Sequence, residues 1–302
     1  MPWIIFAFAG PVLWAVSTHI DKYLVERYFK EGNVAVLMVF TAIVGILVLP
    51  VIWFFNPDVV RLDFRSAFLI AVSGILYMGA IYFYLQALQK EEASTVAPFF
   101  QAAGIFGLIL GYFFLGEKLS FLQVIGVLSI ITGSVLLSLR FGNGAVRVRT
   151  RLVILMLSCA LAIALSSFIF KFFAVQGDFW TTVFWSYGGD ALFGIGLMLV
   201  AENRRQFVKM MRANTGAVLS INAANELINL GGSLGSEYAL ILAPLGIVQA
   251  ISSTTSFFVL GFGVLLSICF PKLGKEDLAA GSLAQKIIAV ALVTAGILLI
   301  NR

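Results

Sequence analysis

The chain has 302 residues, of which 61% belong to the hydrophobic set and only 12% are charged. A soluble domain carries about 25% charged residues, so this chain lacks the charged groups needed to cover a water-exposed globule of its size. The net charge of +5 comes from the segments between apolar runs, where it reports membrane topology rather than nucleic-acid binding. The composition therefore excludes a soluble globular protein and predicts an integral membrane protein.

The first apolar run begins at Trp3 with no basic residue before it and continues past His19 without a small-residue cleavage site. It is therefore predicted to be a membrane span rather than a signal peptide. The two cysteines, Cys159 and Cys269, both lie inside apolar runs, where a thiol packs as a small hydrophobic group. We expect no disulfide framework, no metal cluster and no bound cofactor.

Ten apolar runs follow one another along the chain. A spanning helix needs about 20 mostly apolar residues, and backbone polar groups in hydrocarbon must be paired within the segment, so each run is predicted to be α-helical. The runs cover residues 3–24, 34–55, 66–88, 94–115, 121–139, 152–174, 180–201, 215–237, 243–269 and 284–301. The connections that carry turn-forming and charged residues are 56–65, 142–151 and 203–214.

The two halves of the chain resemble each other. The segment Ser17–Lys22 aligns with Ser166–Lys171, and Val96–Pro98 aligns with Leu242–Pro244. The repeat is five helices long, so the second copy must cross the membrane in the opposite sense, as in the inverted repeats of many secondary transporters. We expect a first repeat over residues 1–141, a basic linker over 142–151 and a second repeat over 152–302.

Several short motifs of the first half occur together in one known family. They are Leu13-Trp14 with Ser17 and Lys22, the segment Ala93–Pro98, and the segment Leu115–Ser120; in the second half, Ala243–Leu245 repeats part of the second motif. In these motifs the sequence resembles the EamA-domain transporters of the drug/metabolite transporter superfamily. The resemblance implies an all-α bundle of ten transmembrane helices around a central cavity, which moves small organic solutes by alternating access. It does not specify the solute.

The eighth run, residues 215–237, contains a row of polar residues. At helical spacing they fall within one arc of roughly 80°, and they are Asn222, Asn225, Glu226, Asn229 and Ser233. A charged residue at the centre of a spanning helix costs roughly 2.5–3.5 kcal/mol, so the row is not expected to face lipid. We interpret it as a polar wall of the solute cavity, with Glu226 as the first candidate for solute binding or coupling. The alternative is a hydrogen-bonded packing seam between helices.

Asp190 is a second acidic residue in the middle of an apolar run, and like Glu226 it lacks an evident basic partner at the same depth. Lys171 lies near the end of its run, and its ammonium group is expected to extend toward water. Two unpaired acids favour a cationic or zwitterionic solute over a phosphate or a sugar nucleotide, which would need Arg or Lys. Either acid is also a candidate proton carrier; the alternative is a neutral acid hydrogen-bonded to the backbone.

Other polar and aromatic residues share faces of the remaining predicted helices. Candidate lining residues are Gln249, Ser252, Ser253 and Ser256 in the ninth run, Gln101 in the fourth, and Tyr77 and Tyr84 in the third. Gln101 follows Pro98, and a proline leaves a carbonyl free for a ligand or water. His19 and Lys22 form a candidate gate near the membrane boundary, with a structural histidine as the alternative.

Of the 20 Lys and Arg residues, 15 lie toward the connections that follow odd-numbered runs. By the positive-inside rule these connections are cytoplasmic and both termini external, whereas the family resemblance implies cytoplasmic termini. The sequence therefore leaves the orientation open. In a bacterium, the resemblance implies the inner membrane.

The predicted function is that of a secondary, gradient-driven transporter of a small polar organic solute, with protons as the candidate coupling ion. The expected partners are the solute and the lipid bilayer, without nucleic acid; the oligomeric state is open. One alternative is a non-transporting receptor or assembly partner. Another is a membrane enzyme acting on lipid-linked substrates, which would need clustered acids, histidines or arginines at one membrane face, whereas the chain has 1 His.

Overall fold

The computed structural model describes residues 3–28, 34–88, 101–138, 150–213, 215–269 and 280–300. Every regular element in these ranges is a helix. The helices are α1 (Trp3–Tyr28), α2 (Val34–Phe55), the 3₁₀ helix η1 (Pro57–Arg61), α3 (Phe64–Leu88), α5 (Ala102–Phe114), α6 (Phe121–Ser138), α7 (Thr150–Gln176), α8 (Phe179–Leu199), α9 (Ala201–Ala213), α10 (Thr215–Leu242), α11 (Leu245–Ser252), α12 (Thr255–Cys269) and α13 (Ala280–Ile300).

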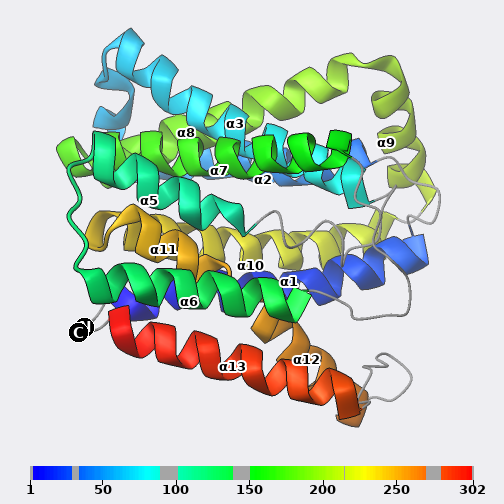
Figure 1. The fold of residues 1–302 in the computed structure, drawn as a ribbon. Coiled ribbons are helices and arrows are strands. Elements are labelled where there is room, and N and C mark those ends of the chain that lie inside the picture. The colour runs from blue at the N-terminus through cyan, green and yellow to red at the C-terminus, as the bar shows by residue number, and fades with distance from the viewer. Residues whose placement is uncertain are drawn as a thin grey trace.

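The long helices lie side by side with roughly parallel axes (Figure 1). α8 packs on α2 and α3, α3 also packs on α7, α1 packs along α10, α5 packs on α7 and α11, and α13 packs on α6. The start of α1 and the end of α13 lie at one end of the bundle, and α9 lies at the other (Figure 1). A shared end for the first and last helices is consistent with an even number of membrane crossings.

Five helical segments of the described chain are long and apolar enough to cross a membrane. They are Trp3–Asp21, Val34–Phe55, Phe64–Ala87, Val153–Gln176 and Leu245–Leu266. A sixth is added if α8 and α9, which meet at 94°, are one broken span. Exposed Phe54, Phe55 and Phe113 add apolar surface suited to lipid. The all-α membrane class is confirmed, while ten spans in two inverted repeats stays a prediction.

The connection predicted over residues 203–214 is wrong for most of its length, because α9 occupies it. Asn203, Phe207 and Met211 recur every four residues. Asn203 is buried, and Phe207 and Met211 pack against Val36 and Phe40 of α2. This spacing places the three side chains on one helical face, so the segment folds as a helix although its other face is strongly charged.

The ninth run, expected as one helix, is divided into α11 and α12 between Ser252 and Thr255. The Ser253 hydroxyl donates to the Ala250 carbonyl at 2.6 Å, and the Thr254 hydroxyl donates to the Ile251 carbonyl at 2.6 Å. Hydroxyl side chains that bond nearby carbonyls compete with the helical ladder. These bonds accompany the interruption and occupy the carbonyls at the end of α11.

Two glycines allow the backbones of α3 and α8 to approach closely. A Cβ atom added to Gly74 would lie 2.1 Å from the Ser186 carbonyl oxygen, and one added to Gly189 would lie 1.9 Å from the Ala71 carbonyl oxygen. Such contacts exclude any side chain at either position. The close packing brings Asp190, one residue beyond Gly189, against α3: its Oδ1 lies 2.8 Å from the position of a Cβ on Gly74.

Candidate functional site

The polar row predicted in the eighth run lies on α10, and its first half is buried against α1 and α2. Asn222, Asn225 and Glu226 are 3%, 1% and 7% exposed. Asn229 and Ser233, further along the helix, are half-buried. Because the buried part of the row contacts side chains of neighbouring helices, it faces protein rather than lipid, which is compatible with both a cavity wall and a packing seam.

Asn225 joins α10 to α1 through Asp21. Its amide nitrogen Nδ2 donates to Asp21 Oδ1 at 2.7 Å, and the buried Ser17 hydroxyl donates to Asp21 Oδ2 at 3.5 Å. The other amide atom, Asn225 Oδ1, is buried without a hydrogen-bond partner in the described part of the chain. Asp21 is absent from the predicted site, although its position in the first apolar run and its spacing from Ser17 are the signals that could have identified it.

Glu226 joins α10 to α2. The Thr41 hydroxyl donates to Glu226 Oε1 at 3.0 Å, and the Asn229 amide, one turn further along α10, also hydrogen-bonds the Glu226 carboxyl. Asp21 interacts electrostatically with the same carboxyl. Glu226 is thus held by neutral donors and has another acid as its charged neighbour.

A second acidic group lies between α3, α8 and α10. Tyr77 interacts electrostatically with Asp190, Glu237 and Glu226, and Tyr187 interacts with Glu237 and Asp190 and hydrogen-bonds Ser233. Oδ1 of Asp190 and Oε2 of Glu237 are buried and have no hydrogen-bond partner among the described residues. Glu237 is missing from the predicted site because it stands at the last position of its predicted run, where a carboxylate is expected to reach water.

The four acids on α1, α8 and α10 form a connected arrangement. Asp21 interacts with Glu226, and Glu226, Asp190 and Glu237 all interact with Tyr77. In the described part of the chain, no Lys or Arg forms an ion pair with any of the four. A buried carboxylate without a cationic partner is costly, so this region can be neutralised by protons or by a bound cationic group.

The predicted stripe of the ninth run is divided by the helix break and connects to other helices. Gln249 Nε2 donates to the Ser167 hydroxyl of α7 at 2.6 Å. Ser253 lies 3.0 Å from the Ser134 hydroxyl of α6, and Ser252 donates to the Val248 carbonyl of its own helix at 3.0 Å. Ser256 is half-buried on α12. These bonds are the kind that a packing seam makes.

The remaining predicted lining residues lie on α3 and at the start of α5. Tyr77 and Tyr84 both pack against a buried cluster that includes Met156 and Ala160 of α7. Tyr77 also interacts electrostatically with the acids described above. Gln101 is buried directly before α5. Pro98, which precedes Gln101 by three residues, lies outside the described residues.

The candidate gate has one described member. The Nε2–H of His19 donates to the Val259 carbonyl of α12 at 3.0 Å, so His19 links α1 to α12. The side chain of Lys22 lies outside the described residues.

Lys171 does not extend to water, which corrects the expectation drawn from its position near a helix end. It is buried; its Nζ lies 2.5 Å from Glu117 Oε1 and donates to the Ala243 carbonyl at 2.5 Å. Glu117 Oε2 accepts the Leu245 backbone N–H at 2.8 Å. The ion pair therefore connects the turn between α5 and α6 to α7 and to the junction of α10 and α11.

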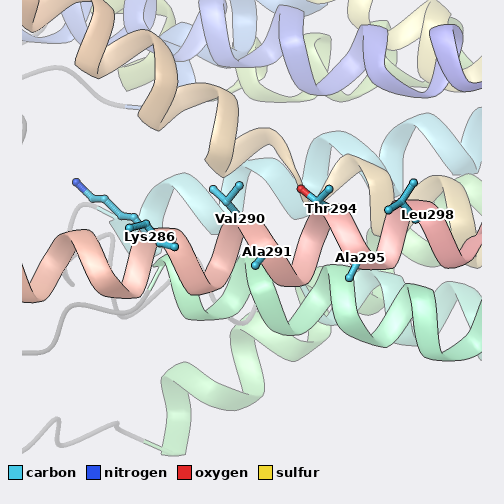
Figure 2. Close-up of a pocket in the computed structure, with 7 residues that line it drawn as sticks. Lys286, Val290, Ala291, Thr294, Ala295 and Leu298 are labelled. Atoms are coloured by element: carbon cyan, nitrogen blue, oxygen red, sulfur yellow. The ribbon is translucent and has the colours of Figure 1, made fainter.

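Two cavities of the described structure lie outside the α10 row. The larger, about 600 Å³, is lined only by α13 residues, among them Val290, Thr294 and Leu298; Figure 2 shows these side chains along one helix. It is therefore an open apolar groove rather than a chamber. The smaller, about 280 Å³, lies between α5, α6 and α11 and includes Glu117 and Gly246. Among the described residues, no group of three or more His, Cys, Asp and Glu could hold a metal ion.

Comparison with known proteins gives a family match over the first part of the chain and a shared fold over its whole length. Residues 1–139 match the EamA-like transporter family. No curated protein matches the chain. Among solved structures, a crystal structure with 15% sequence identity aligns with a TM-score of 0.69, covering 99% of this chain and 96% of that chain. At this level of identity the likeness shows a shared fold over the whole length, and nothing about function.

The family match confirms, over residues 1–139, the resemblance to EamA-domain transporters indicated by the sequence motifs. With the apolar helices, it defines an integral, multi-pass membrane protein and indicates a membrane transporter of the drug/metabolite transporter type. The matched part includes Ser17 and the Leu115–Ser120 motif. In this motif Gly116 has a φ of +67°, a value that favours glycine, and Glu117 forms the buried ion pair.

Proposed function

We propose that this protein is a secondary transporter of a small cationic or zwitterionic organic solute. Ten transmembrane helices in two inverted five-helix repeats, residues 1–141 and 152–302, would move the solute by alternating access. The observation that carries the proposal is the set of buried and half-buried carboxyls on α1, α8 and α10. They accept hydrogen bonds from an amide and a hydroxyl of neighbouring helices and interact electrostatically with Tyr77. The match of residues 1–139 to a transporter family supports it.

The chemistry of the acids favours a positively charged group on the solute. Asp190 Oδ1, Glu237 Oε2 and Asn225 Oδ1 are three buried acceptors without a hydrogen-bond partner among the described residues. Buried polar atoms are nearly always paired, and an ammonium group supplies up to three donors together with the compensating charge. Tyr77 and Tyr187 add aromatic faces of the kind that attract organic cations. A phosphate or carboxylate solute would meet repulsion in the same place.

Alternating access requires the α10 row to open to water in at least one state. Asn222, Asn225 and Glu226 are buried in this conformation, and in the proposed cycle it corresponds to an occluded state. Opening toward the row would separate α10 from α1 or α2. The two contacts to be broken are Asn225 with Asp21 and Thr41 with Glu226.

Glu226 is the proposed coupling residue because its carboxyl accepts the Thr41 hydrogen bond, which would break when α10 separates from α2. Either a proton or the cationic solute neutralises Glu226. Because an ionised carboxylate without a partner is costly inside the membrane, the transporter would not pass through the closed state with Glu226 ionised and no solute bound. The energy source would be a proton or solute gradient, and the bilayer is the medium that makes uncompensated charge costly.

Uptake into proteoliposomes tests the function. The probes are a panel of amines, amino acids, cationic drugs and simple carboxylates, each measured with and without a pH gradient. We expect uptake of cationic or zwitterionic members and a loss of gradient dependence in Glu226→Gln. Asp58→Asn is the matched control, since Asp58 is exposed and paired with Arg61. Uptake restricted to anions would contradict the solute class, and unchanged gradient dependence in Glu226→Gln would contradict the coupling role.

Access to the row is a separate test. Asn222→Cys, in a background with Cys159→Ala and Cys269→Ser, places a thiol in the row, and a membrane-impermeant thiol reagent reports whether water reaches it. We expect the reagent to label this thiol from one side of the membrane. Addition of a transported solute should change the rate of labelling. A thiol that stays unlabelled from both sides, with and without solute, would indicate a sealed packing seam and overturn the proposed transport route.

A further inference from the structure

The position of α9 follows from the end of α8. Val200 is extended, with φ −73° and ψ 116°, and the axis turns by 94° into α9. The bend is fixed by hydrogen bonds, because the Leu197 carbonyl accepts both the Val200 N–H at 3.3 Å and the Asn203 amide at 3.0 Å. α9 therefore crosses the end of the bundle instead of continuing along it (Figure 1).

The inner face of α9 is attached to the spanning helices. The rings of Phe207 and Phe40 lie 5.2 Å apart, and Met211 packs in the same cluster with Ile20 and Ile221. These contacts join α9 to α1, α2 and α10. Since α2 is long and apolar enough to span and α9 crosses the end of the bundle (Figure 1), we expect α9 where the spanning helices leave the hydrocarbon, with its axis close to the plane of the membrane.

The outer face of α9 is strongly basic. Its exposed basic residues are Arg204, Arg205, Lys209 and Arg212. The helix contains one acidic residue, Glu202, whose carboxyl is already bonded to Gln206 at 2.7 Å and to Arg205. The Gln206 amide is the largest influence that lowers the pKa of this exposed carboxyl, followed by Arg205. Glu202 therefore does not compensate the positive charge of Arg204, Lys209 and Arg212.

We infer that the basic outer face of α9 binds the phosphate groups of anionic phospholipids. Arginine side chains match the geometry of a phosphodiester, and a helix lying in the interface with an apolar face inward and Lys/Arg outward is the arrangement that recognises anionic membranes. Because the apolar face of α9 packs against α1, α2 and α10, its Arg and Lys side chains are positioned on the outer face without bound lipid. This inference does not depend on the transport activity.

The test compares two triple variants of the full-length protein. One is Arg204→Gln/Lys209→Gln/Arg212→Gln on α9. The matched control, Arg61→Gln/Arg65→Gln/Lys118→Gln, removes the same charge from η1, the start of α3 and the turn between α5 and α6, all of which lie at the opposite end of the bundle (Figure 1). The measurements are the number of phosphatidylglycerol molecules retained in native mass spectra and the rise in Tm on titrating phosphatidylglycerol into detergent-solubilised protein.

We expect phosphatidylglycerol, and not phosphatidylcholine, to raise the Tm of the unmodified protein and of the control. In the α9 variant the apparent affinity should fall on the order of 100-fold, roughly fivefold for each basic residue removed near the anionic headgroups. Arg204→Lys/Arg212→Lys preserves the charge and should retain most of the binding, which separates lipid recognition from damage to the fold.

Two results would overturn the inference. One is equal retention of phosphatidylglycerol by the α9 variant and the unmodified protein. The other is an equal rise in Tm with inorganic phosphate, which would assign the basic face to a free anion rather than to lipid.

Discussion

The ammonium nitrogen of Lys171 lies 2.5 Å from Oε1 of Glu117, and the two side chains are only 10% and 14% exposed. The pair also binds the backbone on both sides of Pro244, through the Ala243 carbonyl and the Leu245 N–H. One ion pair thereby joins a turn of the first half of the chain to three helices of the second half. Its loss should affect the whole end of the bundle at which it lies.

Glu117→Gln should destabilise the protein by about 3 kcal/mol, because removal of one partner leaves a buried charge without compensation. Glu117→Gln/Lys171→Met should recover much of that loss, since two neutral groups leave no buried charge. Thermal or denaturant unfolding in detergent measures both. Asp58→Asn, at the exposed Asp58–Arg61 pair, is the control and should cost less than about 1 kcal/mol. A Glu117→Gln value no larger than that of the control would show that the buried pair is energetically unimportant.

Gly74→Ala should disrupt the packing of α3 on α8. The new Cβ would lie 2.1 Å from the Ser186 carbonyl oxygen, a backbone atom that cannot move without displacing α8, and overpacking of this kind costs typically 1–3 kcal/mol or more. Gly188→Ala, on α8 itself but with no atom within 4 Å of its Cβ position, provides the control. Thermal stability in detergent is the readout. Similar Tm values for the two variants would refute the close approach.

Thr41→Val should weaken solute transport without removing any charge. The Thr41 hydroxyl is the donor to Glu226 at 3.0 Å, and the loss of one hydrogen bond is worth about 1 kcal/mol, so we expect roughly a fivefold rise in the KM for the solute found in the panel. The control is Thr132→Val, whose exposed hydroxyl bonds the Leu128 carbonyl of its own helix. An equal KM in both variants would show that the hydrogen bond between Thr41 and Glu226 does not contribute to solute binding.

Exchange of Asp21 and Asn225 tests whether their contact matters as a pair. Asp21→Asn removes the acid that accepts from Asn225 at 2.7 Å and should reduce uptake, as should Asn225→Asp, which brings two acids together. The double variant Asp21→Asn/Asn225→Asp restores one acid and one amide across the same interface, so uptake should recover relative to either single variant. Additive losses in the double variant would show that the two residues act independently.

The apolar runs allowed most helices to be predicted from the sequence, because in hydrocarbon the backbone has no alternative to helical pairing. α2 begins and ends at the predicted residues. The helix α9 was missed because its charged composition masked a four-residue repeat of Asn203, Phe207 and Met211. The break between α11 and α12 is not predicted from the sequence, because Ser253 is interpreted there only as a cavity residue, whereas its hydroxyl and that of Thr254 bond carbonyls of their own helix.

The candidate site was predictable only where one helix carries the pattern. Burial of Asn222, Asn225 and Glu226 follows from their shared face, whereas their partners Asp21 and Thr41 come from other helices, and no local spacing specifies such contacts. The same limit explains Lys171. Position within its own helix indicated a water-exposed end, and the partner that keeps it buried, Glu117, lies 54 residues earlier in the chain.

The interruption at Ser253 and Thr254 separates two helices, α11 and α12, that bind different parts of the bundle. α11 is fastened to α7 through Gln249 and Ser167 and to Glu117 through the Leu245 N–H, whereas α12 is fastened to α1 through His19 and Val259. A continuous helix would transmit a tilt at either extremity rigidly to the other. Because the helix is interrupted near its middle, α11 and α12 can each move with the helices that they contact. The contacts of one of them can therefore break while those of the other are kept.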